Sequence, residues 1–215
     1  MLGWTPPSES WGQSAVGRVT GTVKLTVATS APSAASAYDR RAIGPRPKPQ
    51  PELRNVVIYF DGLPGGTVEK MNTSIAQQDE QFTPHVAAVT VGSQVWFPNR
   101  DPFFHNVFSL SRGSTFDLGR YAGGANRHRV LTQPGIVKVY CHLHSQMSAV
   151  IRVFNHGWFV IPEEDGTFAI DRVPPGEHTL VAWHERIGER RDRVTIRADA
   201  PTAVTFTLPV LEPGK

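Results

Sequence analysis

The feature that most restricts the fold is a succession of short apolar runs, each ending in a glycine- or proline-rich turn. Gly17–Val27 alternates apolar with polar or small residues, and Val56–Asp61 is a nearly continuous apolar run that stops at Gly62-Leu-Pro-Gly-Gly. No long stretch repeats apolar residues at the i, i+3, i+4, i+7 spacing of an amphipathic helix. With 19 glycines and 18 prolines in 215 residues, the chain has the turns that many short strands require. We therefore expect an all-β protein.

Charge and cysteine content narrow the possible functions. The formal net charge is +3, and the basic residues concentrate in 40–48 and 185–197, which we interpret as solvated surface and not as a nucleic-acid site. The one cysteine excludes an intramolecular disulfide. No run of 18 apolar residues exists, so we expect no membrane span. Residues 1–13 lack the pattern of a secretory signal, which leaves a cytosolic protein or one whose signal has been removed.

The positions of the predicted turns and loops suggest how the chain is organised into domains. We expect a disordered leader over 1–15, strands over 16–62 with a proline-rich loop over 30–52, a first β-domain over 63–155 and a smaller β-domain over 156–215. Residues 113–135 are glycine-rich and predicted to be irregular. One hypothesis joins 16–62 and 156–213 into one sandwich with the other domain inserted. In the alternative, the N-terminal strands extend the first domain.

One turn concentrates metal-ligating chemistry. Cys141, His144 and Met147 form a C-x2-H-x2-M motif between two predicted strands, and His105 stands on a separate strand. Three ligands on a tight loop can converge on one point with a fourth from a neighbouring strand, which the end of a β-sandwich provides. Soft sulfur ligands select copper, and two histidines and a cysteine with a weak methionine are typical of electron-transfer copper sites.

Other interpretations of this motif exist. A lone cysteine or methionine is often a buried apolar filler. The polar Ser145-Gln146 pair argues against Met147 being only part of an apolar strand. Zinc accepts cysteine and histidine but disfavours methionine. A nucleophilic Cys–His pair would need an orienting carboxylate and an oxyanion hole, and the motif suggests neither.

Longer segments resemble known families. TVGSQVWFPNRDPFFHN and the short ligand loop are similar to the plastocyanin and azurin group of cupredoxins, with a loop of the amicyanin length. FPNRDPFFHNVFSLS, FDLGRY and PGIVKVYCHLHSQMSAVIRV resemble plastocyanin-like methylamine-utilisation proteins. EEDGTFAIDRVPPGEHTLVAW resembles a carboxypeptidase-regulatory or transthyretin-like sandwich. The resemblance implies a cupredoxin Greek-key β-sandwich plus a second, smaller β-sandwich.

The cupredoxin resemblance also implies a function. Carried over residue by residue, His105, Cys141, His144 and Met147 hold one copper ion in a type 1 site. Asn106 would fix the ligand loop by hydrogen bonds. The implied role is not enzymatic: it is one-electron transfer between donor and acceptor proteins, such as a cytochrome or a dehydrogenase, in the periplasm or outside the cell. Copper delivery or storage, and a structural or adhesion role with accessory copper, remain alternatives.

The remaining histidines and the nearby aromatic residues are not expected to bind the metal. His142 follows the cysteine directly and is expected to point away from the metal, since side chains alternate along an extended chain. Four aromatic residues are expected to pack around the metal end: Phe103, Phe104, Phe108 and Tyr121. The other histidines are interpreted as surface or strand-edge residues: His85, His128, His156, His178 and His184.

Overall fold

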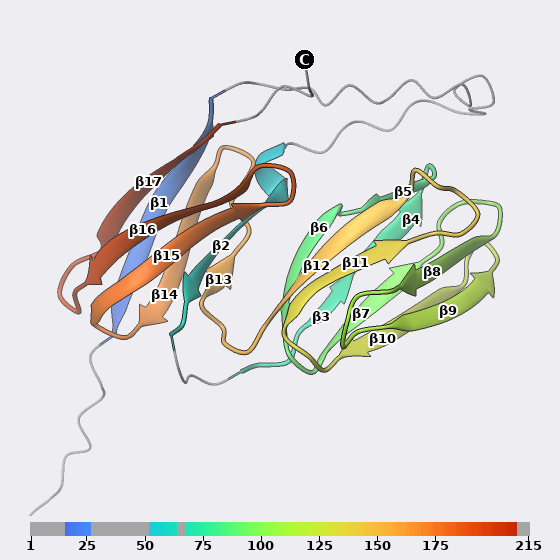
Figure 1. The fold of residues 1–215 in the computed structure, drawn as a ribbon, viewed down its shortest axis with the longest axis horizontal. Coiled ribbons are helices and arrows are strands. Elements are labelled where there is room, and N and C mark those ends of the chain that lie inside the picture. Colours follow the sequence, from blue (N-terminus) through green and yellow to red (C-terminus); the bar gives the residue numbers. More distant parts are fainter. Residues whose placement is uncertain (1–15, 27–51, 64–67, 210–215) are drawn as a thin grey trace, which may run out of the picture.

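The computed structural model describes residues 16–26, 52–63 and 68–209, and in these ranges it is built almost wholly of β-strands (Figure 1). The all-β prediction with two β-sandwiches is confirmed. The predicted leader over 1–15 and the predicted proline-rich loop, except for residue 52, lie outside the described residues. In the part of the chain that is described, no helix has the length and apolar character needed to cross a bilayer.

The first sandwich spans 68–154 and contains a five-stranded sheet, β6-β12-β11-β8-β9, facing the smaller sheet β10-β7-β3, with the hairpin β4-β5 beside them. Its strands are β3 (Asn72–Ser74), β4 (Ala76–Gln78), β5 (Gln81–Thr83), β6 (Val86–Thr90), β7 (Ser93–Pro98), β8 (His105–Ser109), β9 (Phe116–Tyr121), β10 (Asn126–Leu131), β11 (Gly135–Tyr140) and β12 (Ser148–Phe154). Alternate residues of β7 and β11 enter one core, among them Val95, Phe97, Val137 and Val139. Several sheet neighbours are distant in sequence, as in a Greek-key chain path.

The second sandwich combines strands from both ends of the described chain. Its elements are β1 (Gly17–Leu25), the 3-10 helix η2 (Glu52–Asn55), β2 (Val56–Asp61), β13 (Phe159–Val160), β14 (Thr167–Val173), β15 (Gly176–His184), β16 (Gly188–Ile196) and β17 (Thr202–Leu208). The sheets are β14-β1-β17 and β13-β2-β15-β16, and Figure 1 shows blue β1 between β14 and β17. Val19 and Val23 share a buried cluster with Leu180 and Ala182. The domain boundaries themselves stay a prediction.

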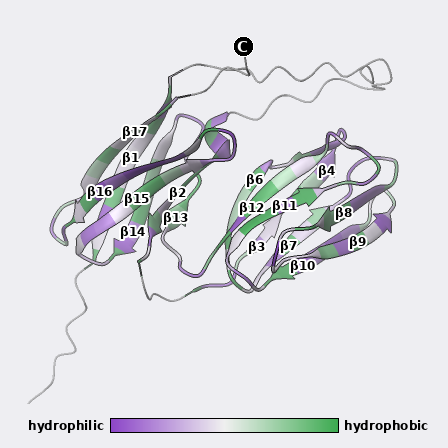
Figure 2. Cartoon of the chain, in the orientation of Figure 1, coloured by the Kyte–Doolittle hydropathy of each residue, from purple (hydrophilic) through white to green (hydrophobic). Residues whose placement is uncertain are grey.

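Four strands are buried on both faces, and this joins the sandwiches. On β2, Ile58 enters the core of the second sandwich, whereas Val57 and Tyr59 enter a separate cluster between the sandwiches. The same division occurs on β15, β6 and β12, so the cluster also contains Val86, Ala88, Val150, Phe154, Val181 and Trp183. By contrast, hydrophilic residues dominate the edge strand β16 (Figure 2).

The structure corrects the prediction for residues 113–135. Instead of an irregular loop, this segment contains β9 and β10, which pair with β8 and β7 respectively. Five of the six residues of β10 are exposed, so the strand lacks the regular apolar alternation used to predict strands. Its position at the edge of a sheet explains this composition, because an edge strand is only partly covered.

Candidate metal centre

Three predicted ligands meet at one end of the first sandwich. His105 is the first residue of β8, Cys141 directly follows β11, and His144 lies in the turn before β12. His105 Nδ1 is 3.1 Å from His144 Nδ1, and the Cys141 Sγ atom is 3.9 Å from the first and 3.8 Å from the second. His105 and Cys141 are buried, and His144 is half-buried.

The size of this triangle suits a transition metal. Donor atoms 3.1, 3.8 and 3.9 Å apart share an in-plane point about 2.0 Å from both nitrogens and about 2.3 Å from the sulfur, the usual lengths of such metal bonds. Within the described ranges, these residues form the one group of three or more His, Cys, Asp or Glu side chains with converging ligand atoms. The residues present therefore fit a metal ion held by two imidazoles and a thiolate.

Met147 lies at the end of the same turn. Its backbone N–H donates to the His144 carbonyl oxygen over 3.0 Å, which closes the turn. The side chain is buried in the cluster that also contains Cys141. The structure thus brings the methionine to the end of the sandwich where the other three predicted ligands meet.

The protein environment favours the thiolate form of Cys141. Burial raises the pKa of the thiol, whereas a hydrogen bond with the His105 ring lowers it. The backbone N–H groups of Asn106 and Leu143 also donate to the sulfur, and the net result is a pKa of about 6. Burial lowers the pKa of His105, but the contacts of its ring with Cys141 and Asp101 have the larger effect, so the net pKa is raised. These directions favour a thiolate beside an imidazolium, so metal binding would displace a proton.

Asp101 is a site residue that sequence reasoning missed. Its Oδ2 atom lies 2.7 Å from His105 Nε2, and both residues are buried. Because a carboxylate only accepts hydrogen bonds, Nε2 carries the hydrogen and Nδ1 is the nitrogen presented to Cys141. Backbone N–H groups of Asp79 and Glu80 donate to the same carboxylate over 2.7 and 3.0 Å.

The loop before His105 is held by Asn99. The Asn99 side chain donates to the carbonyl oxygens of Phe103 and Tyr121 over 2.8 and 3.2 Å. Its own oxygen accepts the Asp101 N–H over 3.0 Å. The polar segment Asn99-Arg100-Asp101, which interrupts an apolar stretch ahead of the histidine, is the signal that could have identified Asp101.

Asn106 connects the ligand turn to β9. Its side-chain oxygen accepts the His142 N–H over 3.4 Å, and its side-chain nitrogen donates to Asp117 Oδ1 over 2.7 Å. Together with its backbone N–H on the Cys141 sulfur, these contacts fix where Cys141 lies relative to β8.

The aromatic residues around the site have different roles. The Phe103 ring contacts the rings of His105 and His144, with centroids 5.2 and 5.6 Å away. Phe103, Phe104 and Leu143 are 39%, 51% and 41% exposed, so an apolar surface lies close to His144. Tyr121, by contrast, is buried and donates to the Phe97 carbonyl oxygen over 2.9 Å.

Two histidines differ from their predicted positions. His156 and His184 are buried, although both were interpreted as surface or strand-edge residues. His184 occupies the end of β15, where Glu52 of η2 lies 3.0 Å from its Nε2 atom. This contact joins segments more than 130 residues apart, which explains why local sequence did not indicate burial. His142 is exposed and lies against the Phe108 ring, with centroids 3.7 Å apart.

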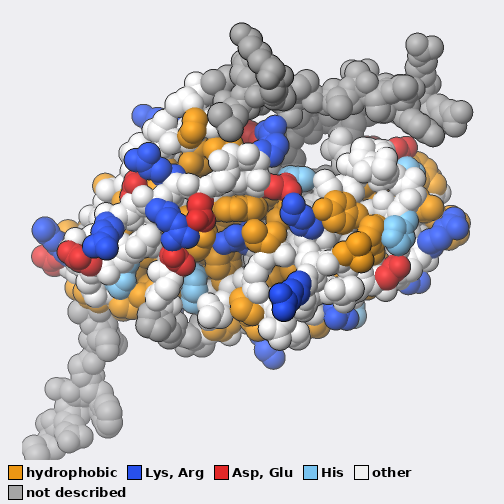
Figure 3. Space-filling view, in the orientation of Figure 1, with side chains coloured by type: hydrophobic (Ala, Val, Ile, Leu, Met, Phe, Trp, Pro, Cys, Tyr) orange, Lys and Arg blue, Asp and Glu red, His pale blue; other side chains and the backbone are white. Residues whose placement is uncertain are grey.

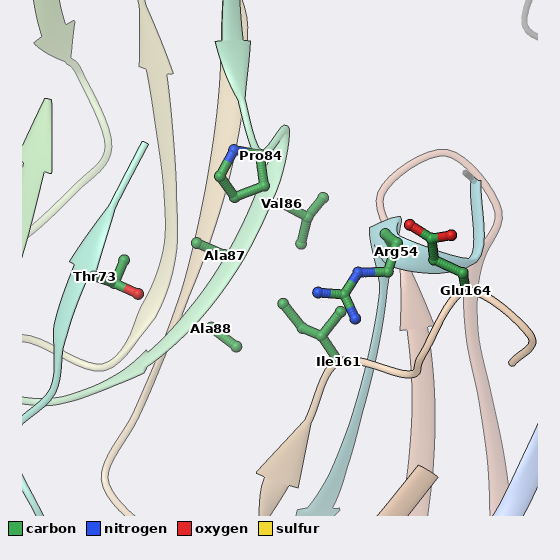
Figure 4. Close-up of a pocket in the computed structure, with 8 residues that line it drawn as sticks. All are labelled: Arg54, Thr73, Pro84, Val86, Ala87, Ala88, Ile161 and Glu164. Atoms are coloured by element: carbon green, nitrogen blue, oxygen red, sulfur yellow. The ribbon is translucent and has the colours of Figure 1, made fainter. Parts of the chain in front are cut away.

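A cleft of about 400 Å³ lies between the sandwiches, away from the predicted ligand residues (Figure 4). It is lined by Arg54, Thr73, Pro84, Val86, Ala87, Ala88, Ile161 and Glu164, none of which belongs to the predicted ligand set. Elsewhere on the face shown in Figure 3, Lys and Arg side chains are spread over both sandwiches and mixed with acidic ones.

Comparisons with known proteins give a partial likeness in fold. No family model and no curated protein matches the chain. A copper-containing nitrite reductase from Thermus scotoductus SA-01 matches 44% of this chain with 22% identity and a TM-score of 0.38, and this chain spans 25% of that enzyme. A purple cupredoxin from Nitrosopumilus maritimus matches 38% of the chain, and 98% of its own length, with 22% identity and a TM-score of 0.34. A reduced amicyanin mutant matches 37% of the chain, and 79% of its own length, with 18% identity and a TM-score of 0.35.

Proposed function

We propose that the chain binds one copper ion through His105, Cys141, His144 and Met147 and transfers single electrons between protein partners. The observation that carries this proposal is the convergence of two imidazole nitrogens and a thiolate within a triangle of metal-binding size. The buried methionine on the same turn favours copper over zinc, because a thioether is a soft ligand that zinc disfavours. The chemistry that copper would supply is the change between Cu(I) and Cu(II).

The chain's own residues would keep the site the same in both oxidation states. His105 lies on β8, which pairs with β9, and Cys141 directly follows β11, which pairs with β12. Asp101 fixes the orientation of the His105 ring. Backbone N–H groups that donate to the thiolate hold its position and stabilise its charge. Donor atoms that hardly move on electron transfer need little rearrangement, which keeps transfer fast.

The apolar surface formed by Phe103, Phe104 and Leu143 suits contact with a redox partner. A partner covering this surface would approach the half-buried ring of His144 and exclude water from the path. In this proposal one protein, such as a cytochrome or a dehydrogenase, donates the electron and another accepts it. The exchange would take place in the periplasm or outside the cell, and the chain acts as a carrier and not as an enzyme.

Titration of the metal-free protein with one equivalent of Cu(II) tests the site. We expect an intense thiolate-to-copper absorption band and a narrow copper hyperfine splitting in EPR, both absent in Cys141→Ser. His142→Ala is the matched control, because His142 adjoins the cysteine but is exposed and lies against Phe108. It should keep both signals. A pale solution with an ordinary Cu(II) spectrum would refute the proposed site.

Voltammetry of the loaded protein then distinguishes carrying electrons from delivering copper. A carrier gives a reversible one-electron wave and keeps its copper through repeated cycles. Loss of copper to an apo acceptor after each reduction, without a reversible wave, would favour delivery or storage instead.

A further inference from the structure

The tip of the β15–β16 hairpin contacts the first sandwich close to the ligand turn. Glu185, at this tip, places Oε2 2.8 Å from His85 Nε2. His85 belongs to the first sandwich, and its Nδ1 atom lies 3.0 Å from the backbone oxygen of Ser148. Ser148 directly follows Met147. A chain of two hydrogen bonds therefore connects the second sandwich to the residue beside Met147, the predicted thioether ligand.

The partners of the His85 ring define its protonation. A carbonyl oxygen and a carboxylate can only accept hydrogen bonds, so both ring nitrogens of His85 act as donors and the ring is an imidazolium. The pKa directions agree, since the hydrogen bond with Glu185 raises the pKa of His85 and lowers that of Glu185. Such charge-assisted hydrogen bonds are stronger than neutral ones and fix geometry more firmly.

The two sequence neighbours of Glu185, His184 and Arg186, both contact Glu52. His184 Nε2 lies 3.0 Å from Glu52 Oε1, and the Arg186 guanidinium pairs with the same carboxylate. The backbone N–H of Arg186 also donates to His184 Nδ1 over 3.2 Å. The hairpin tip is thus anchored to η2, which makes Glu185 a fixed support for His85.

His85 also holds the strand that begins after the methionine. Its backbone oxygen accepts the Val150 N–H over 2.8 Å, two residues beyond the Ser148 carbonyl that its ring contacts. At the other end, the Met147 N–H donates to the His144 oxygen. Residues 147–150 are therefore fixed between the ligand turn and His85.

We propose that His85 and Glu185 are positioning residues for Met147, through which the second sandwich fixes where the thioether lies relative to the other three predicted ligands. The expected effect on the reduction potential rests on the proposed copper function. The positioning itself needs no metal. A displaced thioether would change the reduction potential, because the thioether ligand would tune the potential of a bound copper ion.

The test compares full-length Glu185→Gln and Glu185→Ala with the control Asp171→Asn. Asp171 forms an exposed ion pair with Arg18 in the second sandwich, so the control removes the same charge elsewhere. In the metal-free proteins, NMR measures amide exchange at Met147 and Val150, with Val23 of the other sandwich as reference. In the copper-loaded proteins, the reduction potential and the EPR spectrum are measured.

We expect exchange at Met147 and Val150 to rise on the order of tenfold in both Glu185 variants, the factor for loss of a hydrogen bond to a charged group. Val23 and the control should be unchanged, and the potential should shift only in the Glu185 variants. Unchanged exchange at both amides in Glu185→Ala would overturn the proposal. If the wild-type chain forms no type 1 site, the copper function fails while the exchange experiment still decides the positioning.

Discussion

Asp101 accepts a hydrogen bond from His105 Nε2 over 2.7 Å, and this contact determines which nitrogen of His105 faces Cys141. The two residues are four apart and both buried, so the carboxylate acts as a fixed orienting group for the ring. The ligand geometry thus depends on a residue outside the C-x2-H-x2-M motif.

Replacing Asp101 with asparagine should weaken metal binding. The amide is neutral and can present its nitrogen to the ring, so it no longer enforces the orientation of His105. We expect copper affinity to fall about 10- to 100-fold, the usual effect of losing such a partner. Competition with a chelator of known affinity measures it. Asp79→Asn, an exposed change of the same kind, is the control, and equal affinities in the two variants would contradict this role.

Gly123 and Gly124 offer a second, independent test of the Asp101 loop. A Cβ atom at Gly123 would overlap the Asp101 carbonyl oxygen, whereas one at Gly124 meets nothing within 4 Å. Gly124 has a φ of +81°, so Gly124→Ala should cost about 1 to 2 kcal/mol of unfolding free energy through strain alone. Gly123→Ala should also reduce copper affinity, because it displaces Asp101. Denaturant unfolding and the same chelator competition measure both effects. If Gly124→Ala lowered affinity as much as Gly123→Ala, the explanation would be wrong.

Arg152 should stabilise the contact between the sandwiches. Its guanidinium carbon lies 4.9 Å from the ring centroids of Tyr59 and Trp183 and 5.4 Å from that of Phe154. Lysine keeps the charge but lacks the planar group that stacks on rings. We expect Arg152→Lys to lower the unfolding free energy by about 1 to 2 kcal/mol. Arg190→Lys, at an exposed arginine paired with Asp192, should change it by less than about 0.5 kcal/mol. Urea unfolding provides the comparison.

The His85–Glu185 pair should make stability depend on pH. The pKa of His85 is raised from 6.5, so its contribution is complete below pH 6.5 and is lost as pH rises through the higher folded-state value. The pKa of Glu185 is lowered from 4.5, so its contribution is complete above pH 4.5 and is lost as pH falls through the folded-state value. The pair is therefore fully effective between pH 4.5 and 6.5.

His85→Asn should remove this dependence. The difference in unfolding free energy between wild type and variant is expected to be about 1 kcal/mol larger at pH 5.5 than at pH 8.5, a modest value because the pair is partly exposed to solvent. Urea unfolding at both pH values provides the measurement. A difference that is the same at both would show that the pair does not titrate as described.

Local sequence patterns were sufficient to predict some parts of the fold and the candidate site, but not others. Cys141, His144 and Met147 share one turn, and His105 begins a recognisable strand, so spacing alone indicated that they could meet. Asp101 depends on a loop shape that Asn99 enforces, and spacing carries no information about that shape. The strand β10 was missed because its exposed, charged residues hide the alternation of a strand.

Long-range pairing accounts for the other differences. His184 is buried because Glu52, distant in sequence, lies beside it. The position of β1 between β14 and β17 likewise depends on partners about 150 residues or more away. Short-range periodicity identifies such strands but does not select their neighbours.

The four strands with two apolar faces have a consequence for any attempt to isolate a minimal metal-binding fragment. Excision of residues 63–155 would transfer Val86, Ala88, Val150 and Phe154 from a packed interior to water. The fragment would carry an exposed apolar sheet face and would be expected to self-associate. Transfer of the proposed metal site to another protein would therefore require a substitute for the covering sheet of the second sandwich as well as the ligand residues.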